Sequence, residues 1–426
     1  MSKHNLFLFF THILVFMVPV NFAGLFSSPE SGNEIGDNDA AMDAFINPHN
    51  PDLFAAEFAN DDKGSTRRDL HTTCEATNVI DKCWRGKSDW AENRQALADC
   101  ALGFATGTTG GKGGDIYVVT DPSDDDCENP KEGTLRFGVT RDRPLWITFE
   151  KDMVITLKHE LVIANDKTID GRGASVEIAN GGGLSINKVN NVIIHGIHVH
   201  HIKVMDGGKI RSSETKASAR SKSDGDAISV FGSTKVWIDH VTLDHGEDGL
   251  LDVTMKSTAV TISNCDFNHH NKVILLGADD SHTEDKNMLV TVAFNKFHEG
   301  CVQRLPRCRH GFFQVVNNDY DKWQMYAIGG SSNPTILSQG NRFMAADEKR
   351  LKQVTQRNNA AEEEWKNWKW KSENDIFLNG AYFVQSGGDI QPTPEQSAGL
   401  IAPSTTPVEV LTKDAGKLAC IPGQPC

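Results

Sequence analysis

Short segments in the middle of the chain alternate apolar and polar residues, which is typical of β-strands with one buried face. Each segment places an apolar residue, here called an anchor, five positions after an aliphatic one. The anchors are Val199, Leu243, Phe267, Phe297, Tyr320 and, less cleanly, Phe343. Their steps are 44, 24, 30, 23 and 23 residues, interpreted as about two turns and then single turns of a repeat. This period predicts an all-β parallel β-helix, a solenoid of stacked turns.

Asparagines accompany three successive anchors. Asn295, Asn318 and Asn341 each lie two positions before an anchor, so their amides should stack into a ladder. A leucine-rich horseshoe would need repeated leucines that this chain lacks. A β-sandwich would show turn signals every 8 to 12 residues or so, instead of coils of this length. The solenoid therefore explains the pattern best.

The flanks of the repeat differ from it in composition. Residues 24–73 are acidic, show no sustained period and are expected to be a flexible pre-segment. Residues 74–345 are assigned to the β-helix domain, with a short amphipathic helix expected near residues 90–104. Residues 346–426 are expected to form a C-terminal segment that packs on the solenoid, beginning with a stretch that is helical in composition.

Two tryptophans in that C-terminal segment allow two interpretations. Trp365 and Trp368 could share one face of a helix. They could form a platform on which a sugar stacks, or they could pack a helix or loop against the solenoid. Packing is favoured, because aromatic side chains more often serve that purpose.

The N-terminus has the pattern of a secretory signal. Lys3 and His4 precede an apolar run over residues 6–20, and Ala23 precedes Gly24 as a small-residue cleavage position. A retained signal anchor is the alternative, but the run is short for a membrane span. We therefore expect a signal peptide over residues 1–23 and a secreted protein of the extracellular space or cell wall, with no membrane association after cleavage.

Charge limits the partners of this chain. Its 426 residues carry a formal net charge of −14, with 43 Lys and Arg against 57 Asp and Glu. Most of the surface should repel nucleic acid and anionic lipid, so any anionic ligand needs a local basic patch. The segment "QRLPRCRHG" provides one, with Arg304, Arg307, Arg309 and His310.

Secretion makes the nine cysteines candidates for disulfide bonds. Close spacing favours Cys83 with Cys100 and Cys420 with Cys426. The count is odd, so at least one cysteine stays free or pairs outside the chain.

Acidic residues recur one turn apart in the solenoid, where such residues become neighbours. Asp224 and Asp226 precede the coil of "VWIDH", and Asp248 and Asp252 follow one coil later. Four carboxylates in one patch repel each other unless a cation relieves them, and a cage of oxygen atoms suits Ca²⁺. Solvated loop acids are the alternative. Asp239 lies inside its strand and is expected to be structural.

Basic residues follow the acids at similar spacing. Lys272 lies about one coil after Asp248, and the arginine cluster lies about one coil further on. A carboxylate cage beside cations suits a polyanion whose own carboxylates can bridge the metal. These features together point to an acidic polysaccharide as substrate.

From about Cys83 to Phe343 the sequence resembles the pectate lyases of polysaccharide lyase family 1. The resemblance rests on "WAENRQALADCALGFATG", "TIDGRG", "SDGDAIS", "VWIDH", "LLG" and "QRLPRCRHGFFQVVNNDY". With "KEGTLRFGVTRDRPLWI" and "TPEQSAG", it is similar to the pollen pectate lyases of the ragweed and mugwort allergen group.

The resemblance implies a right-handed parallel β-helix, Ca²⁺ as cofactor and β-elimination of polygalacturonate or pectin as the reaction. It implies a monomer and possible recognition by IgE as a pollen allergen. It assigns Arg304 as the base, Lys272 and Arg309 to substrate carboxylates, and Asp224 or Asp226, Asp248 and Asp252 to calcium. Ala278 replaces the histidine that the family usually has after "LLG", a change that bears on substrate preference.

Other functions fit parts of the same pattern. A β-helical polygalacturonase would use acids to activate water and would hydrolyse the same polymer. A pectin lyase acts on methylated substrate, which does not call for a calcium cage. A catalytically weak protein that binds cell-wall pectin could retain the fold, because fold alone does not decide function.

Overall fold

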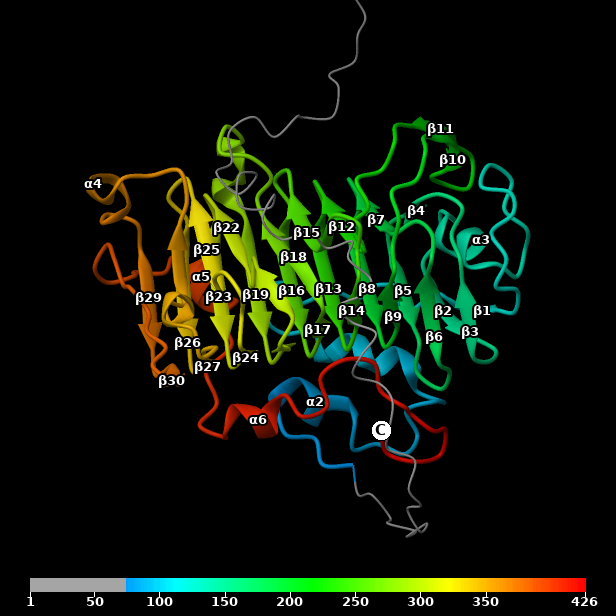
Figure 1. Cartoon of the computed structure of the whole chain (residues 1–426). Helices are drawn as coiled ribbons and strands as arrows, with labels where there is room; N and C mark the ends of the chain where they lie inside the picture. The colour runs from blue at the N-terminus through cyan, green and yellow to red at the C-terminus, as the bar shows by residue number, and fades with distance from the viewer. Residues whose placement is uncertain (1–73) are drawn as a thin grey trace, which may run out of the picture. The chain divides into compact units, whose positions relative to one another are not determined.

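Residues 74–426 are described by the computed structural model (Figure 1). The expected signal peptide, residues 1–23, and pre-segment, residues 24–73, lie outside the described residues. Within residues 74–426, three long parallel sheets run along a right-handed parallel β-helix, as the anchors predict. The described part contains no helix that is both long and apolar enough to cross a membrane.

Most turns of the solenoid contribute one strand to each sheet. Sheet I contains β1 (Asp115–Val119), β2 (Leu145–Phe149), β5 (Lys167–Asp170), β8 (Asn190–His195), β13 (Thr234–Asp239), β16 (Thr258–Ser263), β19 (Leu289–Ala293), β23 (Phe312–Val316), β26 (Thr335–Gln339) and β29 (Trp370–Glu373). Sheet II contains β4 (Leu161–Val162), β7 (Leu184–Asn187), β12 (Ile228–Phe231), β15 (Gly249–Thr254), β18 (His270–Leu276), β22 (Arg307–Arg309), β25 (Ile328–Ser331) and β28 (Thr355–Arg357), with β21 (Cys301–Gln303) paired to β18. Sheet III contains β3 (Met153–Ile155), β6 (Val176–Ala179), β9 (His198–His200), β14 (Thr242–Asp244), β17 (Asp266–Asn268), β20 (Lys296–Phe297), β24 (Asp319–Asp321), β27 (Arg342–Met344) and β30 (Ile376–Leu378).

Helical elements are short and lie outside the three sheets. They are α2 (Val79–Trp84), α3 (Leu135–Val139), α4 (Glu362–Trp365), α5 (Pro394–Ala398) and α6 (Val408–Leu411), with 3₁₀ turns η2 (Arg94–Cys100), η3 (Gly103–Ala105), η4 (Thr283–Asn287) and η5 (Lys349–Leu351). The amphipathic helix expected near residues 90–104 is therefore a pair of 3₁₀ turns.

Each predicted anchor pairs with the next one in sheet III. Leu243 lies between Val199 and Phe267, and Tyr320 lies between Phe297 and Phe343. Because Val199 pairs directly with Leu243, the first step is one turn, and the expectation of two turns was wrong. Its additional length is an insertion that carries the antiparallel hairpin β10 (Gly208–Arg211) and β11 (Ala217–Arg220).

The interior is filled by aliphatic side chains and by a stack of aromatic rings. Tyr320 stacks between Phe297 and Phe343, with ring centroids 4.7 and 4.6 Å apart. The predicted asparagine ladder is also present. Asn295 Nδ2 donates to Asn318 Oδ1 at 2.9 Å, and Asn318 Nδ2 donates to Asn341 Oδ1 at 3.0 Å. Buried amides thus satisfy one another from turn to turn.

The solenoid continues past residue 345, where the sequence analysis placed its end. Strands β28, β29 and β30 add a strand to each sheet and extend the β-helix to Leu378. The many charged residues of this stretch concealed the strands, while Val354 and Trp370 point into the core. Trp368 is 2% exposed, which confirms packing rather than a sugar platform at that position.

The N-terminal and C-terminal segments of the described chain cover the outer face of sheet I together (Figure 1). In α2, Asp81 accepts from His240 Nε2 at 2.8 Å and pairs with Arg85 at 2.9 Å. The neighbouring Asp239 is fully buried and accepts hydrogen bonds from Ser263 and Asn264, which confirms its structural role.

Disulfide bonds join Cys83 to Cys100 and Cys420 to Cys426, as their spacing predicts. The other five cysteines are free thiols, namely Cys74, Cys127, Cys265, Cys301 and Cys308.

Candidate active site

The outer face of sheet II brings the predicted acidic and basic residues onto neighbouring turns. Gly249 in β15 lies opposite Lys272 in β18, and Leu275 in β18 lies opposite Arg307 in β22. Parallel in-register strands place side chains of the same orientation one turn apart. Asp248, just before β15, and Asp252, within it, therefore lie close to the cations of β18 and β22.

Three aspartates converge around Gly249. Asp226 Oδ1 accepts a hydrogen bond from the backbone N–H of Gly249 at 2.8 Å. A Cβ on Gly249 would lie 2.8 Å from Oδ1 of Asp226 and 2.8 Å from Oδ1 of Asp252. Asp248, the residue before Gly249, pairs with Lys272 through an Oδ1 to Nζ distance of 3.0 Å. Only a residue without a side chain leaves room for these oxygens to face a common point.

The electrostatics of these acids show how strongly they repel each other without a cation. Burial, followed by repulsion from Asp252, raises the pKa of Asp226 well above its usual value. Burial and repulsion from Asp248 raise the pKa of Asp252 to about 8, although Arg304 and Lys272 act to lower it. The pKa of Asp224, whose side chain reaches the surface, is also raised, by partial desolvation and by Asp248. Paired ionised carboxylates of this kind are stabilised by a cation.

The chemistry of the donor set fits calcium. Every candidate ligand is a carboxylate, and such hard oxygen donors at irregular spacing suit Ca²⁺. Imidazole and thiolate ligands, which would favour zinc, are absent from these four residues. The raised pKa values of Asp226 and Asp252, and the absence of a side chain at Gly249 between their oxygens, support this fit.

The arginine cluster divides into residues with different surroundings. Arg304 is 4% exposed, has a φ of 61°, and is close enough to Asp252 to lower its pKa. Cys308 points into the core, so its neighbours Arg307 and Arg309 point to the outer face of β22. Arg307 is nevertheless fully buried.

Arg309 is held by protein groups on the neighbouring turn. Its Nε lies 3.0 Å from Asp280 Oδ1, and its Nη1 donates to the carbonyl of Gly277 at 3.0 Å. The ring of His310 contacts the carbonyl oxygen of Asp280 at 3.1 Å. A substrate carboxylate at Arg309 would therefore have to share the guanidinium with Asp280.

Sequence reasoning missed two residues of this region. Asp280 is the partner of Arg309. Burial acts to raise the pKa of Asp280, but hydrogen bonds from Ser331 and Asn359 outweigh it and lower that pKa to about 2. His270 contacts the backbone carbonyl of Asp248 at 2.6 Å and so fixes the position of that turn. His270 lies two residues before Lys272 on β18, so the two side chains point to the same side of the strand. This spacing could have identified His270 from the sequence.

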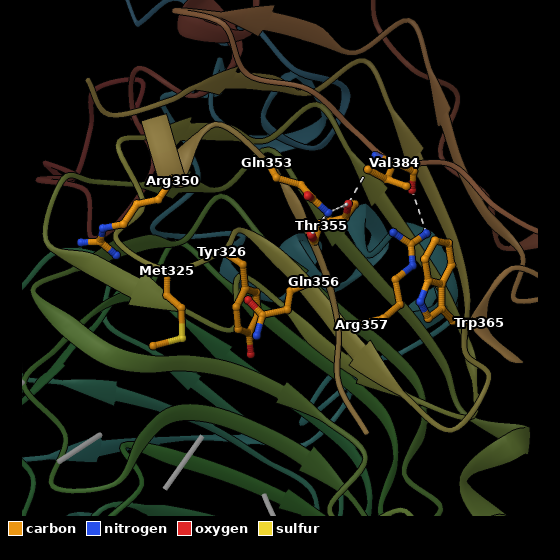
Figure 2. Close-up of a pocket in the computed structure, with 9 residues that line it drawn as sticks. All are labelled: Met325, Tyr326, Arg350, Gln353, Thr355, Gln356, Arg357, Trp365 and Val384. Atoms are coloured by element: carbon orange, nitrogen blue, oxygen red, sulfur yellow. Dashed lines mark hydrogen bonds between the residues drawn. The ribbon is translucent and has the colours of Figure 1, made fainter. Parts of the chain in front are cut away.

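Sheet II also borders a cavity of about 320 Å³ beyond the arginine cluster, at β25 and β28 (Figure 2). Figure 2 shows Arg357 alongside Trp365, and its guanidinium lies 4.7 Å from the Trp365 ring centroid and 4.1 Å from that of Trp370. Burial lowers the pKa of Arg357 to about 10. The cavity is lined by Met325, Tyr326, Arg350, Gln353, Thr355, Gln356, Arg357, Trp365 and Val384.

Known proteins resemble this chain over most of its length. A family model described as pectate lyase matches residues 90–367. Pectate lyase 4 of Ambrosia artemisiifolia is 58% identical over 362 residues, which are 85% of this chain and 91% of that protein. A pectate lyase of Lilium longiflorum is 55% identical over 366 residues, covering 85% of this chain and 84% of its own.

Solved structures resemble the fold. The crystal structure of jun a 1, the major allergen from cedar pollen, has a TM-score of 0.78 and 48% sequence identity, and the match covers 80% of this chain and 100% of that chain. The thermostable pectate lyase PL 47 has a TM-score of 0.57 at 21% identity, covering 74% of this chain and 97% of its own, and supports the fold alone.

Proposed function

Because the chain belongs to the pectate lyase family and is itself a pectate lyase, we propose that it cleaves (1→4)-α-D-galacturonan, the backbone of de-esterified pectin, by Ca²⁺-dependent β-elimination. The proton on C5 of a galacturonate is removed, the C4–O4 bond breaks, and a C4=C5 double bond forms. The leaving oxygen takes up a proton. The products are oligosaccharides that begin with a 4-deoxy-α-D-galact-4-enuronosyl group.

We assign calcium binding to Asp224, Asp226, Asp248 and Asp252. The observation that carries this assignment is the convergence of Asp226, Asp248 and Asp252 around Gly249, with raised pKa values at Asp226 and Asp252, and Asp224 is included because repulsion from Asp248 helps to raise its pKa. When bound, Ca²⁺ would supply positive charge that neutralises these acids and a substrate carboxylate, which makes the C5 proton more acidic. His270 and Lys272 hold Asp248 in place from the next turn.

Arg304 is the proposed base. It lies on the turn next to Lys272, it is almost fully buried, and it acts electrostatically on Asp252. An arginine is ordinarily protonated at neutral pH, so Arg304 can act as a base only in molecules in which its guanidinium has lost a proton. A neutral guanidine can accept the C5 proton, so we expect an alkaline optimum for the reaction.

Lys272 and Arg309 are proposed to bind substrate carboxylates. Both already face an acid of the protein, Asp248 at 3.0 Å and Asp280 at 3.0 Å respectively. These pairs keep the cations oriented before substrate arrives, and a substrate carboxylate then joins each pair.

We further propose that the protein is secreted to the cell wall as a monomer and is an IgE-binding allergen. The signal pattern of residues 1–23 supports secretion. The similarity to a major allergen from cedar pollen supports the allergen assignment.

A spectrophotometric assay on polygalacturonate tests the function. The double bond of the product absorbs ultraviolet light, so the absorbance should rise when enzyme and Ca²⁺ are present. This rise should stop when EDTA is added. Reducing ends without absorbance would identify a hydrolase instead. Binding of polygalacturonate with no turnover would identify a catalytically weak wall-binding protein. Full activity in EDTA would disprove the calcium mechanism.

A further inference from the structure

Histidines and carboxylates gather on the outer face of sheet III, on strands that the proposed reaction does not use. In β9, His198 and His200 lie two positions apart and so point to the same side of the strand. Asp244 of β14 lies opposite His200, and Glu177 of β6 lies opposite His198. Strands β6, β9 and β14 are neighbours in the sheet, and Figure 1 shows them side by side.

The side chains of this group are close enough to share one ion. His198 Nε2 lies 2.6 Å from Asp244 Oδ2, and the rings of His198 and His200 stack with centroids 4.1 Å apart. One ligand atom from each of His198, His200 and Asp244 lies within 4.8 Å of the others. Donors bound to one tetrahedral ion at bond lengths of about 2.0 Å lie roughly 3.3 Å apart. Small rotations of these side chains would therefore reach that geometry.

Second contacts hold the ligands in place. Asp244 Oδ1 lies 2.6 Å from His245 Nδ1, so the carboxylate is fixed by its other oxygen. His200 Nε2 lies 3.3 Å from Glu177 Oε2. Imidazole and carboxylate ligands that are oriented by further hydrogen bonds are the usual arrangement around protein-bound metals.

We propose that His198, His200 and Asp244 form a binding site for a late first-row divalent transition metal such as Zn²⁺. The nitrogen donors separate this site from the all-oxygen cluster at Gly249, since imidazole suits zinc and copper whereas Ca²⁺ takes oxygen. The site is independent of the calcium and base assignments made above.

A second group around Asp244 is a weaker choice. His201 and His245 also lie within 4.8 Å of a carboxylate oxygen of Asp244. Their side chains are 53% and 48% exposed, whereas those of His198 and His200 are 24% and 15% exposed. Fixing the more mobile pair costs more side-chain entropy, so the half-buried pair is favoured.

The sheet also supplies a matched control. His298 Nε2 contacts Asp266 Oδ1 at 2.6 Å, at an exposure of 33% that is similar to that of His198. Among residues 74–426 this pair belongs to no group of three candidate ligands. It therefore reproduces the histidine–carboxylate contact without the third ligand.

Zn²⁺ alone is the probe, titrated calorimetrically into full-length protein that carries no polyhistidine tag and has been stripped with EDTA. We expect one Zn²⁺ to bind with an affinity that His198→Gln weakens by at least about 10-fold. His298→Gln should bind Zn²⁺ as the wild type does. Zn²⁺ should also raise the unfolding temperature of the wild type and of His298→Gln, but not of His198→Gln.

Absence of Zn²⁺ binding, or equal binding by His198→Gln and the wild type, would overturn the proposal. Loss of binding in His201→Gln with retention in His198→Gln would overturn the chosen ligands. The ultraviolet assay with Ca²⁺ on polygalacturonate is run on the same samples. His198→Gln should keep this activity, which shows that it is folded and distinguishes failure of the zinc site from failure of the proposed function.

Discussion

Two sets of polar side chains come from neighbouring turns of this solenoid, and they differ in what satisfies them. In the asparagine ladder, Asn318 both donates to and accepts from its neighbours, and the protein completes every contact. On sheet II, burial and repulsion from neighbouring aspartates raise the pKa values of Asp226 and Asp252. Neighbouring turns therefore give a stable column of amides in one place and an unbalanced cluster of charges in the other.

The difference shows that the chemistry of side chains on neighbouring turns decides whether they stabilise the fold or need a ligand. Identical amides carry a donor and an acceptor each, so a column of them can be extended turn by turn. Carboxylates that cluster across neighbouring turns carry only acceptors and like charges, so they remain costly until a cation or proton arrives. Because the asparagine ladder and the aspartate cluster lie in different parts of the solenoid, the residues that bind a ligand can change without disturbing the residues that hold the fold.

Arg304→Lys tests the proposed active site on the outer face of sheet II, and we expect it to have the largest effect. Lysine keeps a cation but removes the guanidine that would accept the C5 proton, and a general base contributes about 10²- to 10⁴-fold to rate. We expect kcat on polygalacturonate to fall by about 10³-fold, or about 4 kcal/mol. The exposed Arg143→Lys is the control and should be unchanged. Activity of Arg304→Lys within twofold of the wild type would rule out Arg304 as the base.

Asn318→Ala tests the ladder. Asn318 accepts from the N–H and the amide of Asn295 and donates to the carbonyl of Val292 and to Asn341. Each buried group left without a partner costs about 1–3 kcal/mol. We expect the free energy of unfolding in urea to fall by about 3 kcal/mol, with activity per folded molecule retained.

The control for the ladder is the exposed Asn367→Ala, which should change stability by no more than about 0.5 kcal/mol. If Asn318→Ala were as stable as this control, the ladder would contribute nothing beyond a surface amide, and the contrast with the acidic cluster would fail.

Gly249→Ala tests the space between the acids. Its new Cβ would lie 2.8 Å from Oδ1 of both Asp226 and Asp252, so the carboxylates must move apart. Displacement of ligands by a fraction of an ångström to 1 Å is costly in preorganised sites. We expect the Ca²⁺ concentration for half-maximal activity to rise about 10-fold, measured by the ultraviolet assay. An unchanged calcium requirement would show that these oxygens do not hold the ion.

Regular turn spacing is the part of this molecule that sequence reasoning could predict. Steps of 23 residues gave the anchors and the ladder at Asn295, Asn318 and Asn341, because each turn there has the same length. The turn from Val199 to Leu243 was miscounted, because an inserted hairpin lengthens a loop without adding a strand to any of the three sheets. The number of residues between two anchors includes the loops of a turn, so it does not by itself give the number of turns.

Side-chain partners at the site were less predictable. Asp226, Asp248, Asp252 and Lys272 could be grouped from spacing, because they lie within or just before the neighbouring strands β12, β15 and β18, which pair in parallel. The pairing of Arg309 with Asp280 depends on the conformation of the loop after β18, to which neither periodicity nor composition gives access. The strands at 355–378 were missed because the charged side chains on their outer faces obscured a pattern in which Trp370 points inward.

Asp375 combines a position in the asparagine ladder with the buried charge of a carboxylate. We expect Asp375→Asn to have the smallest effect. Asp375 occupies the next rung of the ladder, where its carboxylate accepts from the N–H of Asn341 at 2.8 Å and from its amide at 3.0 Å. Burial raises the pKa of Asp375, although hydrogen bonds from Ser338, Ser372 and Asn341 oppose the rise. A raised pKa in the folded state means that ionisation destabilises the fold. The stabilisation that protonated Asp375 contributes is therefore complete below its unfolded-state pKa of about 3.9, and it is lost as the pH rises through its folded-state pKa.

Asparagine keeps the shape and the ladder contacts, can donate to Ser338 and Ser372 in turn, and does not ionise. At neutral pH we therefore expect Asp375→Asn to be more stable than the wild type by on the order of 1 kcal/mol. The two proteins should converge near pH 4 or so, where Asp375 is protonated. Urea unfolding at both pH values, with saturating Ca²⁺, measures the difference. Lower stability of Asp375→Asn at neutral pH would mean that the ladder gains from ending on a charge, because the donors around Asp375 would then outweigh the cost of burying it.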